Sequence, residues 1–348
     1  MSEKNSYPFI DRLLHRIVLG YPVVSRMSFN IELMLEKERA YQAEQPIFIS
    51  GLARAGTTIL MRIFHETGGF RSLTYRDMPF VLMPNTWKNI SKFFKYTSKS
   101  EQRAHNDGIL IDFDSPEAFD EIFWKFFSTD NYIFEDYLAP HNENLHVIED
   151  FRNFVRLVVS SADDSKQKRY LSKNNNNILR LNTIQRAFPE ALIIIPFRNP
   201  VQHAISLFEQ HTRFCDIHKR ESFSRDYMNW LGHYEFGTNH KPFFFREKNF
   251  MENDYKPDNI NYWLIQWINT YSYLKQSATN NSVFVCYERL CKYPEDTIKN
   301  IFQLSGISEN IQSLKSTIRT PQIKTCHDID EMLEKVASQL YSDILKEY

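Results

Sequence analysis

Residues 46–60 read PIFISGLARAGTTIL. The apolar, β-branched start of this stretch predicts a short buried strand at residues 46–50. A loop of small residues follows at 51–58, and residues 59–66 predict a helix that ends at Gly68 and Gly69. The first N–H groups of a helix are unpaired and carry partial positive charge. A strand, a small-residue loop and a helix start in this order therefore predict a phosphate cradle.

The rest of the chain predicts more strands that alternate with helices. The clearest strand is LIIIPFR at residues 192–198, and further strands are predicted at 71–75, 178–181 and 282–286. Helices are predicted at residues 201–209, 261–276 and 295–304. This alternation predicts the α/β class, with a central parallel sheet flanked by helices.

We expect a single domain over residues 1–348 with three peripheral parts. Residues 1–44 predict a helical arm, and residues 307–348 a C-terminal helical tail. Residues 76–170 predict a mostly helical insert, which we expect to build the acceptor side of a binding pocket. The asparagine run at 174–177 could be simple low complexity.

Composition excludes several classes of protein. The formal net charge is −1, so nothing global indicates binding to nucleic acid or to an anionic membrane. The four cysteines contain no CxxC pair and predict free, mostly buried thiols. The N-terminus lacks the apolar core of a signal peptide, and the longest apolar run, at 191–197, is too short to cross a bilayer. We therefore expect a cytoplasmic protein without a membrane span.

The first loop differs from the Walker A motif of ATP- and GTP-binding proteins. That motif needs GxxxxGK[ST], and Thr57 stands where its lysine would be. The absent lysine argues against ATP and GTP chemistry. Arg54, two residues before Gly56, offers a cation in its place.

The loop resembles that of sulfotransferases that use 3′-phosphoadenosine 5′-phosphosulfate (PAPS). Their loop has the form (R/K)-x-G-T-T after the first strand, and Arg54, Ala55, Gly56, Thr57 and Thr58 match it. The resemblance implies the P-loop-NTPase-like sulfotransferase fold with a helical insert, and a loop that holds the 5′-phosphosulfate. It implies PAPS as co-substrate and adenosine 3′,5′-bisphosphate (PAP) as product. The expected reaction places a sulfuryl group on a hydroxyl or amine of a saccharide or small molecule.

Two later segments carry the same resemblance. Arg198 and Pro200 form an R-x-P sequence, with Ser206 eight residues after the arginine. In the family these residues bind the 3′-phosphate, and Arg198 follows a predicted strand, where open α/β sheets bind ligands. Tyr287 and Glu288 resemble the family's late Y-E-x-L segment. The resemblance therefore covers residues 46–306.

Candidate catalytic groups follow from the chemistry of sulfuryl transfer. A sulfuryl group carries less negative charge than a phosphoryl group, so cations can replace a metal, and no metal is expected. The histidines between 203 and 240 fit no zinc spacing. Arg54 is the first predicted cation. Lys173, expected just before a strand, resembles a family lysine, although Asn175 stands where many members have proline.

A general base must deprotonate the acceptor. Asp77, after the strand predicted at 71–75, is the first candidate, and His105 with Asp107 is the alternative. Arg319 and Lys324 could belong to a late basic loop that closes over the nucleotide.

Two other functions remain open at this stage. A P-loop kinase would show magnesium-dependent ATP turnover, which the absent Walker lysine disfavours. A nucleotide-binding scaffold without catalytic activity would bind PAP but transfer nothing. The acceptor and the oligomeric state are not encoded in any motif of the sequence.

Overall fold

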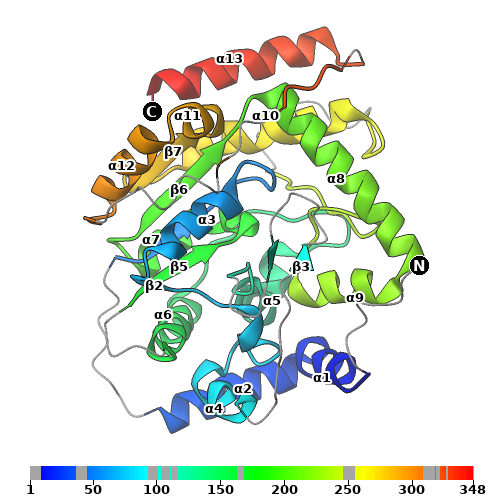
Figure 1. Cartoon of the computed structure of the whole chain (residues 1–348). Coiled ribbons are helices and arrows are strands. Elements are labelled where there is room, and N and C mark those ends of the chain that lie inside the picture. Colours follow the sequence, from blue (N-terminus) through cyan, green and yellow to red (C-terminus); the bar gives the residue numbers. More distant parts are fainter. Residues whose placement is uncertain are drawn as a thin grey trace.

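A parallel sheet with helices on both sides forms the centre of the chain (Figure 1). The structure is a computed structural model. It describes residues 9–36, 45–92, 101–102, 110–111, 116–162, 168–245, 255–308, 318, 322–326 and 328–347.

The sheet has five strands in the order β2-β5-β1-β6-β7, and every neighbouring pair is parallel. The strands are β1 Ile47–Ile49, β2 Phe70–Arg71, β5 Arg169–Lys173, β6 Leu192–Phe197 and β7 Ser282–Cys286. A separate hairpin pairs β3 Glu101–Gln102 with β4 Leu110–Ile111. The carboxyl ends of β1, β5 and β6, three adjacent strands, therefore lie along one edge of the sheet.

Alternate residues of the central strands fill two different cores. Phe48, Ile193 and Ile195 pack in the larger core, whereas Ile49 and Ile194 pack in the smaller one. Because successive side chains of a strand point to opposite faces, both faces of the sheet must be covered. The continuous apolar sequence of β6 is the consequence.

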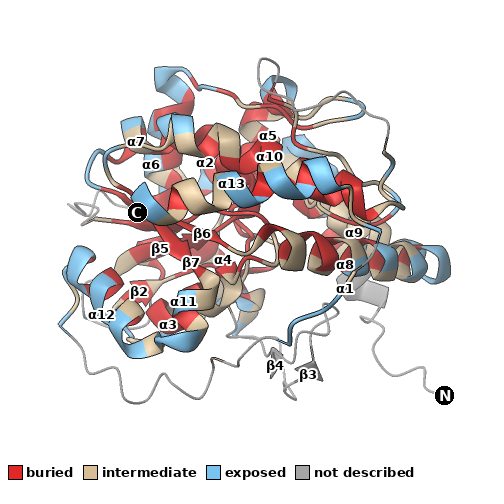
Figure 2. Cartoon of the chain, turned by 90° about the horizontal axis from the view of Figure 1, so that it is seen from above, coloured by how far each residue is buried: buried red, intermediate tan, exposed pale blue. Residues whose placement is uncertain are grey.

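Helices supply the two layers that cover these faces. The helices are α1 Phe9–Gly20, α2 Pro22–Leu35, α3 Thr57–Glu66, α4 Pro84–Ser91, α5 Glu121–Tyr132, α6 Leu145–Ser160, α7 Leu181–Ala187, α8 Pro200–Arg220, α9 Ser222–Leu231, α10 Ile260–Ser277, α11 Tyr287–Lys292, α12 Pro294–Leu304 and α13 Glu331–Glu347. Helices α3 and α12 form the smaller core, where Phe64 and Phe302 lie 5.4 Å apart between ring centres. Helices α5, α6, α8, α10 and α13 contribute to the larger core. Figure 2 shows the buried sides of α8, α10 and α13 turned inward.

The N-terminal helices α1 and α2 pack against the insert. Phe29 is buried against Phe123 of α5, and the buried carboxylate of Glu32 accepts hydrogen bonds from the N–H groups of Asn85 (2.6 Å) and Thr86 at the start of α4. These N–H groups have no partner within their own helix. The described part of the predicted arm is thus helical and attached to α4 and α5.

The predicted strand at residues 178–181 is wrong. These residues lie in a 3-10 helix, Asn175–Arg180, and at the start of α7. The side chain of Asn174 accepts a hydrogen bond from Asn176 N–H and so starts this helix. The strand lies earlier, at Arg169–Lys173, within and beyond the end of the predicted insert. A short apolar run is typical of either a strand or a buried helix, and its length alone does not decide.

The strand predicted at 71–75 is only partly confirmed. Strand β2 ends at Arg71, and Tyr75–Asp77 form a 3-10 turn. Thr74 and Asp77 form a capping box that starts this turn. The predictions at 192–198, 261–276, 282–286 and 295–304 agree with β6, α10, β7 and α12 within two residues at each end. The four cysteines are free, with one buried and three half-buried.

Candidate active site

The small-residue loop between β1 and α3 lies at the carboxyl edge of the sheet. Arg54 and Gly56 both have positive φ, at +71° and +91°. A Cβ atom on Gly56 would lie 2.7 Å from Cδ2 of Tyr287, so the chain approaches that ring too closely for any side chain. Helix α3 begins directly after it at Thr57. Helix α3 thus begins where the sequence predicts an anion cradle, because the first N–H groups of a helix have no partner within that helix.

Two sequence signatures that are 152 residues apart meet at this loop. The Nε of Arg54 donates a hydrogen bond to Oγ of Ser206, at 3.1 Å. Ser206 lies in the second turn of α8, the helix that follows β6. The structure therefore brings the predicted phosphosulfate loop and the predicted 3′-phosphate residues into one site.

Arg198 follows directly after β6 at the same edge. Its guanidinium carbon lies 5.0 Å from the centre of the Tyr287 ring. Its Nε is buried, and no hydrogen-bond partner for it exists among the residues that the structure describes. A buried, unsatisfied guanidinium N–H is costly, and an anion would satisfy it. Tyr287 thus contacts Arg198 and approaches Gly56, and it links the two halves of the site.

The segment that resembles the family's late motif supports the turn after β6. Glu288 accepts a hydrogen bond from Asn199 N–H at 2.9 Å, and Asn199 in turn caps α8 by accepting from Gln202 N–H at 3.1 Å. These contacts fix the backbone between Arg198 and α8. They give Tyr287 and Glu288 structural roles beside the site.

His203 is a site residue that the sequence prediction missed. Its side chain is fully buried, and its Nε2 lies 2.8 Å from the carbonyl oxygen of Ala53 in the loop. A carbonyl only accepts, so Nε2 must donate the hydrogen bond. Burial lowers the pKa of His203 to about 3, and the charges of Arg198 and Arg54 also lower it. The neutral imidazole therefore holds the loop. Its spacing of three residues from Ser206 places both on one face of α8.

Lys173 is the last residue of β5, not a residue before a strand. It pairs in register with Ile49 of β1, which leads into the loop. Its Nζ lies 3.6 Å from Oε1 of Glu117, and both side chains are largely buried. The corrected position places Lys173 at the same carboxyl edge as Arg54 and Arg198.

Asp77 is held by neighbouring groups on both carboxylate oxygens. Oδ1 lies 2.5 Å from Nη2 of Arg71, and Oδ2 accepts a hydrogen bond from Thr74 N–H at 2.7 Å. Only 5% of the residue is exposed. These contacts favour a structural role in the turn after β2.

Of the remaining predicted residues, the structure describes only Lys324. His105, Asp107 and Arg319 lie outside the described residues. Lys324 lies along α8, where its ammonium pairs with Glu209 at 2.5 Å and its backbone exchanges hydrogen bonds with Gln202.

The asparagine run is a buried structural element rather than low complexity. Asn174 donates a hydrogen bond to Oε2 of Glu121 at 2.7 Å, and Asn176 donates to the carbonyl of Gly232 at 3.2 Å. Burial alone would raise the pKa of Glu121, but the charge and hydrogen bonds of Arg180 hold it below its ordinary value. Glu121 and Arg180 are both fully buried, with Nη1 and Oε2 3.1 Å apart. These buried hydrogen bonds and this ion pair stabilise the turn that follows Lys173.

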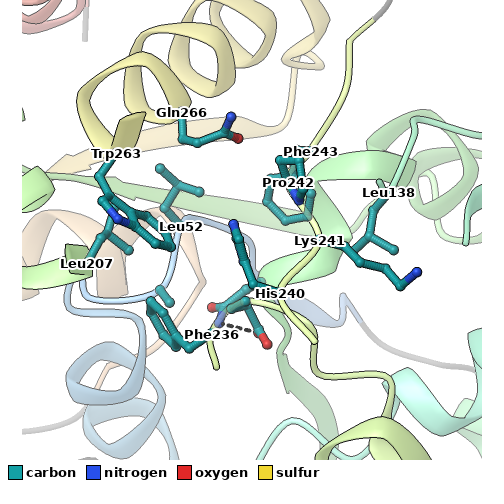
Figure 3. A pocket seen from close by; sticks show the side chains of 13 residues that line it. Leu52, Leu138, Leu207, Phe236, His240, Lys241, Pro242, Phe243, Trp263 and Gln266 are labelled. Atoms are coloured by element: carbon teal, nitrogen blue, oxygen red, sulfur yellow. Dashed lines mark hydrogen bonds between the residues drawn. The ribbon is translucent and has the colours of Figure 1, made fainter. Parts of the chain in front are cut away.

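A narrow recess opens beside the loop (Figure 3). The space inside it that the centre of a water molecule can reach is only about 30 Å³, so it is a small recess. Its lining residues are Leu52, Ala53, Leu138, Asn175, Leu207, Glu235, Phe236, His240, Lys241, Pro242, Phe243, Trp263 and Gln266. We expect from the sequence that the insert at 76–170 builds the acceptor side of a binding pocket, and this expectation stays a prediction. Only Leu138 of this lining comes from the insert, and residues 235–243 and α10 supply most of it.

The comparisons with known proteins agree with this arrangement. The model of the sulfotransferase family matches residues 46–310, which include the loop, the Arg198 signature and the Tyr287 segment. The chain belongs to the sulfotransferase family. The resemblance seen in the sequence is thereby confirmed, and the protein is an enzyme of this family.

Two mycobacterial sulfotransferase structures are similar to the enzyme over nearly its whole length. The sulfotransferase STF9 of Mycobacterium avium is 12% identical, with 99% of this chain and 88% of that chain covered and a TM-score of 0.53. STF1 of Mycobacterium tuberculosis is 13% identical, with 98% and 88% covered and a TM-score of 0.53. These likenesses confirm the predicted α/β fold. A comparison with curated protein sequences found no match.

Within the described ranges, no group of three or more His, Cys, Asp or Glu side chains is placed to hold a metal ion. No helix in the described part of the chain is long and apolar enough to cross a bilayer.

Proposed function

We propose that the enzyme transfers the sulfuryl group of PAPS to a hydroxyl or an amine of a small-molecule or saccharide acceptor and releases PAP. The contact between Arg54 and Ser206 carries this proposal. It joins the two halves of a nucleotide site that the sequence predicts separately. Arg198, with its buried Nε lacking a partner among the described residues, lies against the same ring that approaches the loop.

Each part of the loop has a role in this proposal. The backbone N–H groups from Gly56 to Thr58 and the two threonine hydroxyls bind the 5′-phosphosulfate, while Ala55 N–H donates to the carbonyl of Leu52 and shapes the turn. Arg198 and Ser206 bind the 3′-phosphate. The close approach of Gly56 to the Tyr287 ring and the hydrogen bond from His203 to the carbonyl of Ala53 hold the loop in the required shape.

In the transfer, the acceptor attacks in line with the leaving group. The negative charge that develops on the leaving group must be stabilised. The acceptor oxygen forms a bond to sulfur, the bond between sulfur and the bridging oxygen breaks, and PAP leaves with that electron pair. Arg54 and Lys173 stabilise the negative charge that develops on the bridging oxygen. The acceptor's proton passes to a base. Because Asp77 is held by Arg71 and Thr74, we propose that it fixes the turn and that another group, for which His105 with Asp107 is the alternative from the sequence, takes the proton.

An assay of PAP release tests the proposed reaction. Purified enzyme is incubated with PAPS and a panel of alcohols, amines and saccharides. Lys173→Ala is expected to lower kcat roughly 100-fold, the typical loss for one group that stabilises a developing charge. Exposed Lys256→Ala serves as the matched control and is expected to keep full activity.

The outcomes separate the competing functions. PAP binding without transfer to any acceptor would favour a nucleotide-binding scaffold. Phosphoryl transfer from ATP with magnesium would favour a kinase. Equal activity of Lys173→Ala and Lys256→Ala would contradict the proposed role of Lys173.

A further inference from the structure

The C-terminal helix α13 lies outside the stretch that the family model matches, which ends at residue 310. It packs along α10 (Figure 1). Contacts with α10 hold it at both ends: Asp330 N–H, just before the helix, donates to Oδ1 of Asn261 at 2.9 Å, and Lys275 pairs with Glu347 at 2.6 Å. The larger core receives its buried side chains, Leu333, Ala337 and Ile344. The helix therefore has a fixed position against the core.

One side chain of α13, Tyr341, reaches the turn that follows β6. Its hydroxyl donates a hydrogen bond to Oε2 of Glu288 at 3.1 Å. The other oxygen of this carboxylate, Oε1, accepts a hydrogen bond from Asn199 N–H at 2.9 Å. The Glu288 carboxylate thus connects helix α13 to the residue that directly follows Arg198.

The ring of Tyr341 contacts the residue on the other side of Arg198. The centre of the ring lies 5.6 Å from that of Phe197, the last residue of β6, and the two ring planes meet at 61°. Edge-to-face contacts of this kind are favourable between aromatic rings. Tyr341 therefore contacts Phe197 directly and Asn199 through Glu288, so it acts on both neighbours of Arg198.

The hydroxyl of Tyr341 is the stronger of two donors at Oε2 of Glu288. The other donor is the thiol of Cys286, whose sulfur lies 3.4 Å from this oxygen, and a thiol donates only weakly. Burial raises the pKa of Tyr341 far above its ordinary value, so the hydroxyl keeps its proton and can donate. Loss of the hydroxyl would therefore leave Oε2 with a weak donor and allow the carboxylate to move.

The orientation of Arg198 depends on the backbone at its two neighbours. Its guanidinium lies over the Tyr287 ring, 5.0 Å from the ring centre, and its Nε is buried without a partner among the described residues. Groups that bind a ligand are held in a productive geometry by the packing and hydrogen bonds of the residues behind them. Movement of Phe197 or Asn199 would therefore change the direction in which Arg198 presents its N–H groups.

We propose that Tyr341 is a positioning residue of the nucleotide site, which fixes the backbone on both sides of Arg198 and so orients its guanidinium toward the 3′-phosphate of PAP. The inference rests on the proposed function, which assigns this phosphate to Arg198. It makes α13, a helix that the family model does not match, part of the support of the nucleotide site.

A double-mutant cycle measured by calorimetric titration with PAP tests this role. The four proteins are the wild type, Tyr341→Phe, Arg198→Ala and the double variant. Tyr341→Phe keeps the ring and removes only the hydroxyl. Because the lost hydrogen bond goes to a charged group, the substitution should weaken PAP binding roughly fivefold or more. In the Arg198→Ala background it should change PAP affinity by less than about twofold, because the group that it positions is absent.

A matched control and a melting curve accompany the titrations. Tyr21 is 57% exposed, and Tyr21→Phe should bind PAP as the wild type does. Thermal melting gives the Tm of each variant, and the titrations are done well below it, so that unfolding does not contribute to the measured affinities.

The results distinguish failure of this inference from failure of the proposed function. If Tyr341→Phe binds PAP as tightly as the wild type, the inference is wrong. An equal loss of affinity with and without Arg198 would also overturn it, because that pattern indicates a general structural role. If the wild type does not bind PAP, or if Arg198→Ala binds it normally, the proposed function fails instead.

Discussion

Substitution of Gly56 tests how the two halves of the nucleotide site depend on each other. Gly56 has a φ of +91°, where an alanine costs about 1–2 kcal/mol. Its Cβ would also lie 2.7 Å from Cδ2 of Tyr287, an atom close to the backbone that cannot swing away freely. Displacement of a packed ring adds about 1–2 kcal/mol. Gly56→Ala should therefore lower the free energy of unfolding by about 2–4 kcal/mol.

Gly68 provides a matched control for this substitution. Its φ is +74°, but an added Cβ would meet no atom within 4 Å. Gly68→Ala should thus lose only the backbone part, about 1–2 kcal/mol. For a chain of 348 residues, about 2.1 cal/mol/K of unfolding entropy per residue makes 1 kcal/mol equal to roughly 1.4 °C in Tm. The expected decreases in Tm are about 3–6 °C for Gly56→Ala and about 1–3 °C for Gly68→Ala.

Nucleotide affinity should separate the two variants further. The guanidinium carbon of Arg198 lies 5.0 Å from the centre of the Tyr287 ring, so displacement of the ring also disturbs Arg198. Gly56→Ala should therefore weaken PAP binding at least tenfold, whereas Gly68→Ala should bind PAP normally. Differential scanning fluorimetry and calorimetric titration measure both effects. Equal Tm losses and unchanged PAP affinity in Gly56→Ala would refute the reasoning.

Two further predictions concern the buried network behind Lys173. Arg180→Leu leaves the carboxylate of Glu121 buried without its ion partner, and both side chains are fully buried, so the free energy of unfolding in urea should fall by about 3–5 kcal/mol. The control Lys219→Leu removes an exposed ion pair and should change the free energy of unfolding by less than about 1 kcal/mol. Equal losses in the two variants would contradict the argument. Burial raises the pKa of Asp120 from 3.8 to about 6, so the folded state binds a proton more tightly than the unfolded state, and this contribution to stability is lost as the pH rises from about 4 through 6. Asp120→Asn cannot ionise, and its stability relative to wild type should improve by up to about 3 kcal/mol between pH 4 and pH 7, whereas a difference independent of pH would oppose this assignment.

The sequence allows a feature to be predicted where one contiguous stretch determines both the local structure and the expected function. The loop at 51–56 needs small residues for the anion and a helix start behind it, so its residue types indicate both the turn and the ligand. Strand β6 is buried on both faces and is apolar throughout, which gives an unambiguous pattern. Arg198 and Ser206 could be placed because they adjoin that strand.

Other features depend on contacts between distant segments. Strand β5, RYLSK, has a charged residue at each end, and the buried Lys173 has Glu117, 56 residues earlier in the chain, as an ion partner at 3.6 Å. The asparagines after it are buried because partners such as Glu121 and Gly232 come from other helices and loops. Glu235 gains its position from Asn175, 60 residues away. The local sequence around each of these residues does not predict its distant partner.

The central claim is that Arg198 and the first loop bind one PAP molecule. Calorimetric titration of the wild type, Arg198→Ala and the half-buried control Arg225→Ala with PAP, and separately with ATP and magnesium, tests it most directly. We predict that the wild type and Arg225→Ala bind PAP well, that none binds ATP with magnesium comparably, and that Arg198→Ala loses about 1.5–3 kcal/mol, or roughly 10- to 150-fold in affinity. Strong ATP binding without PAP binding, or unchanged PAP affinity in Arg198→Ala, would contradict the account.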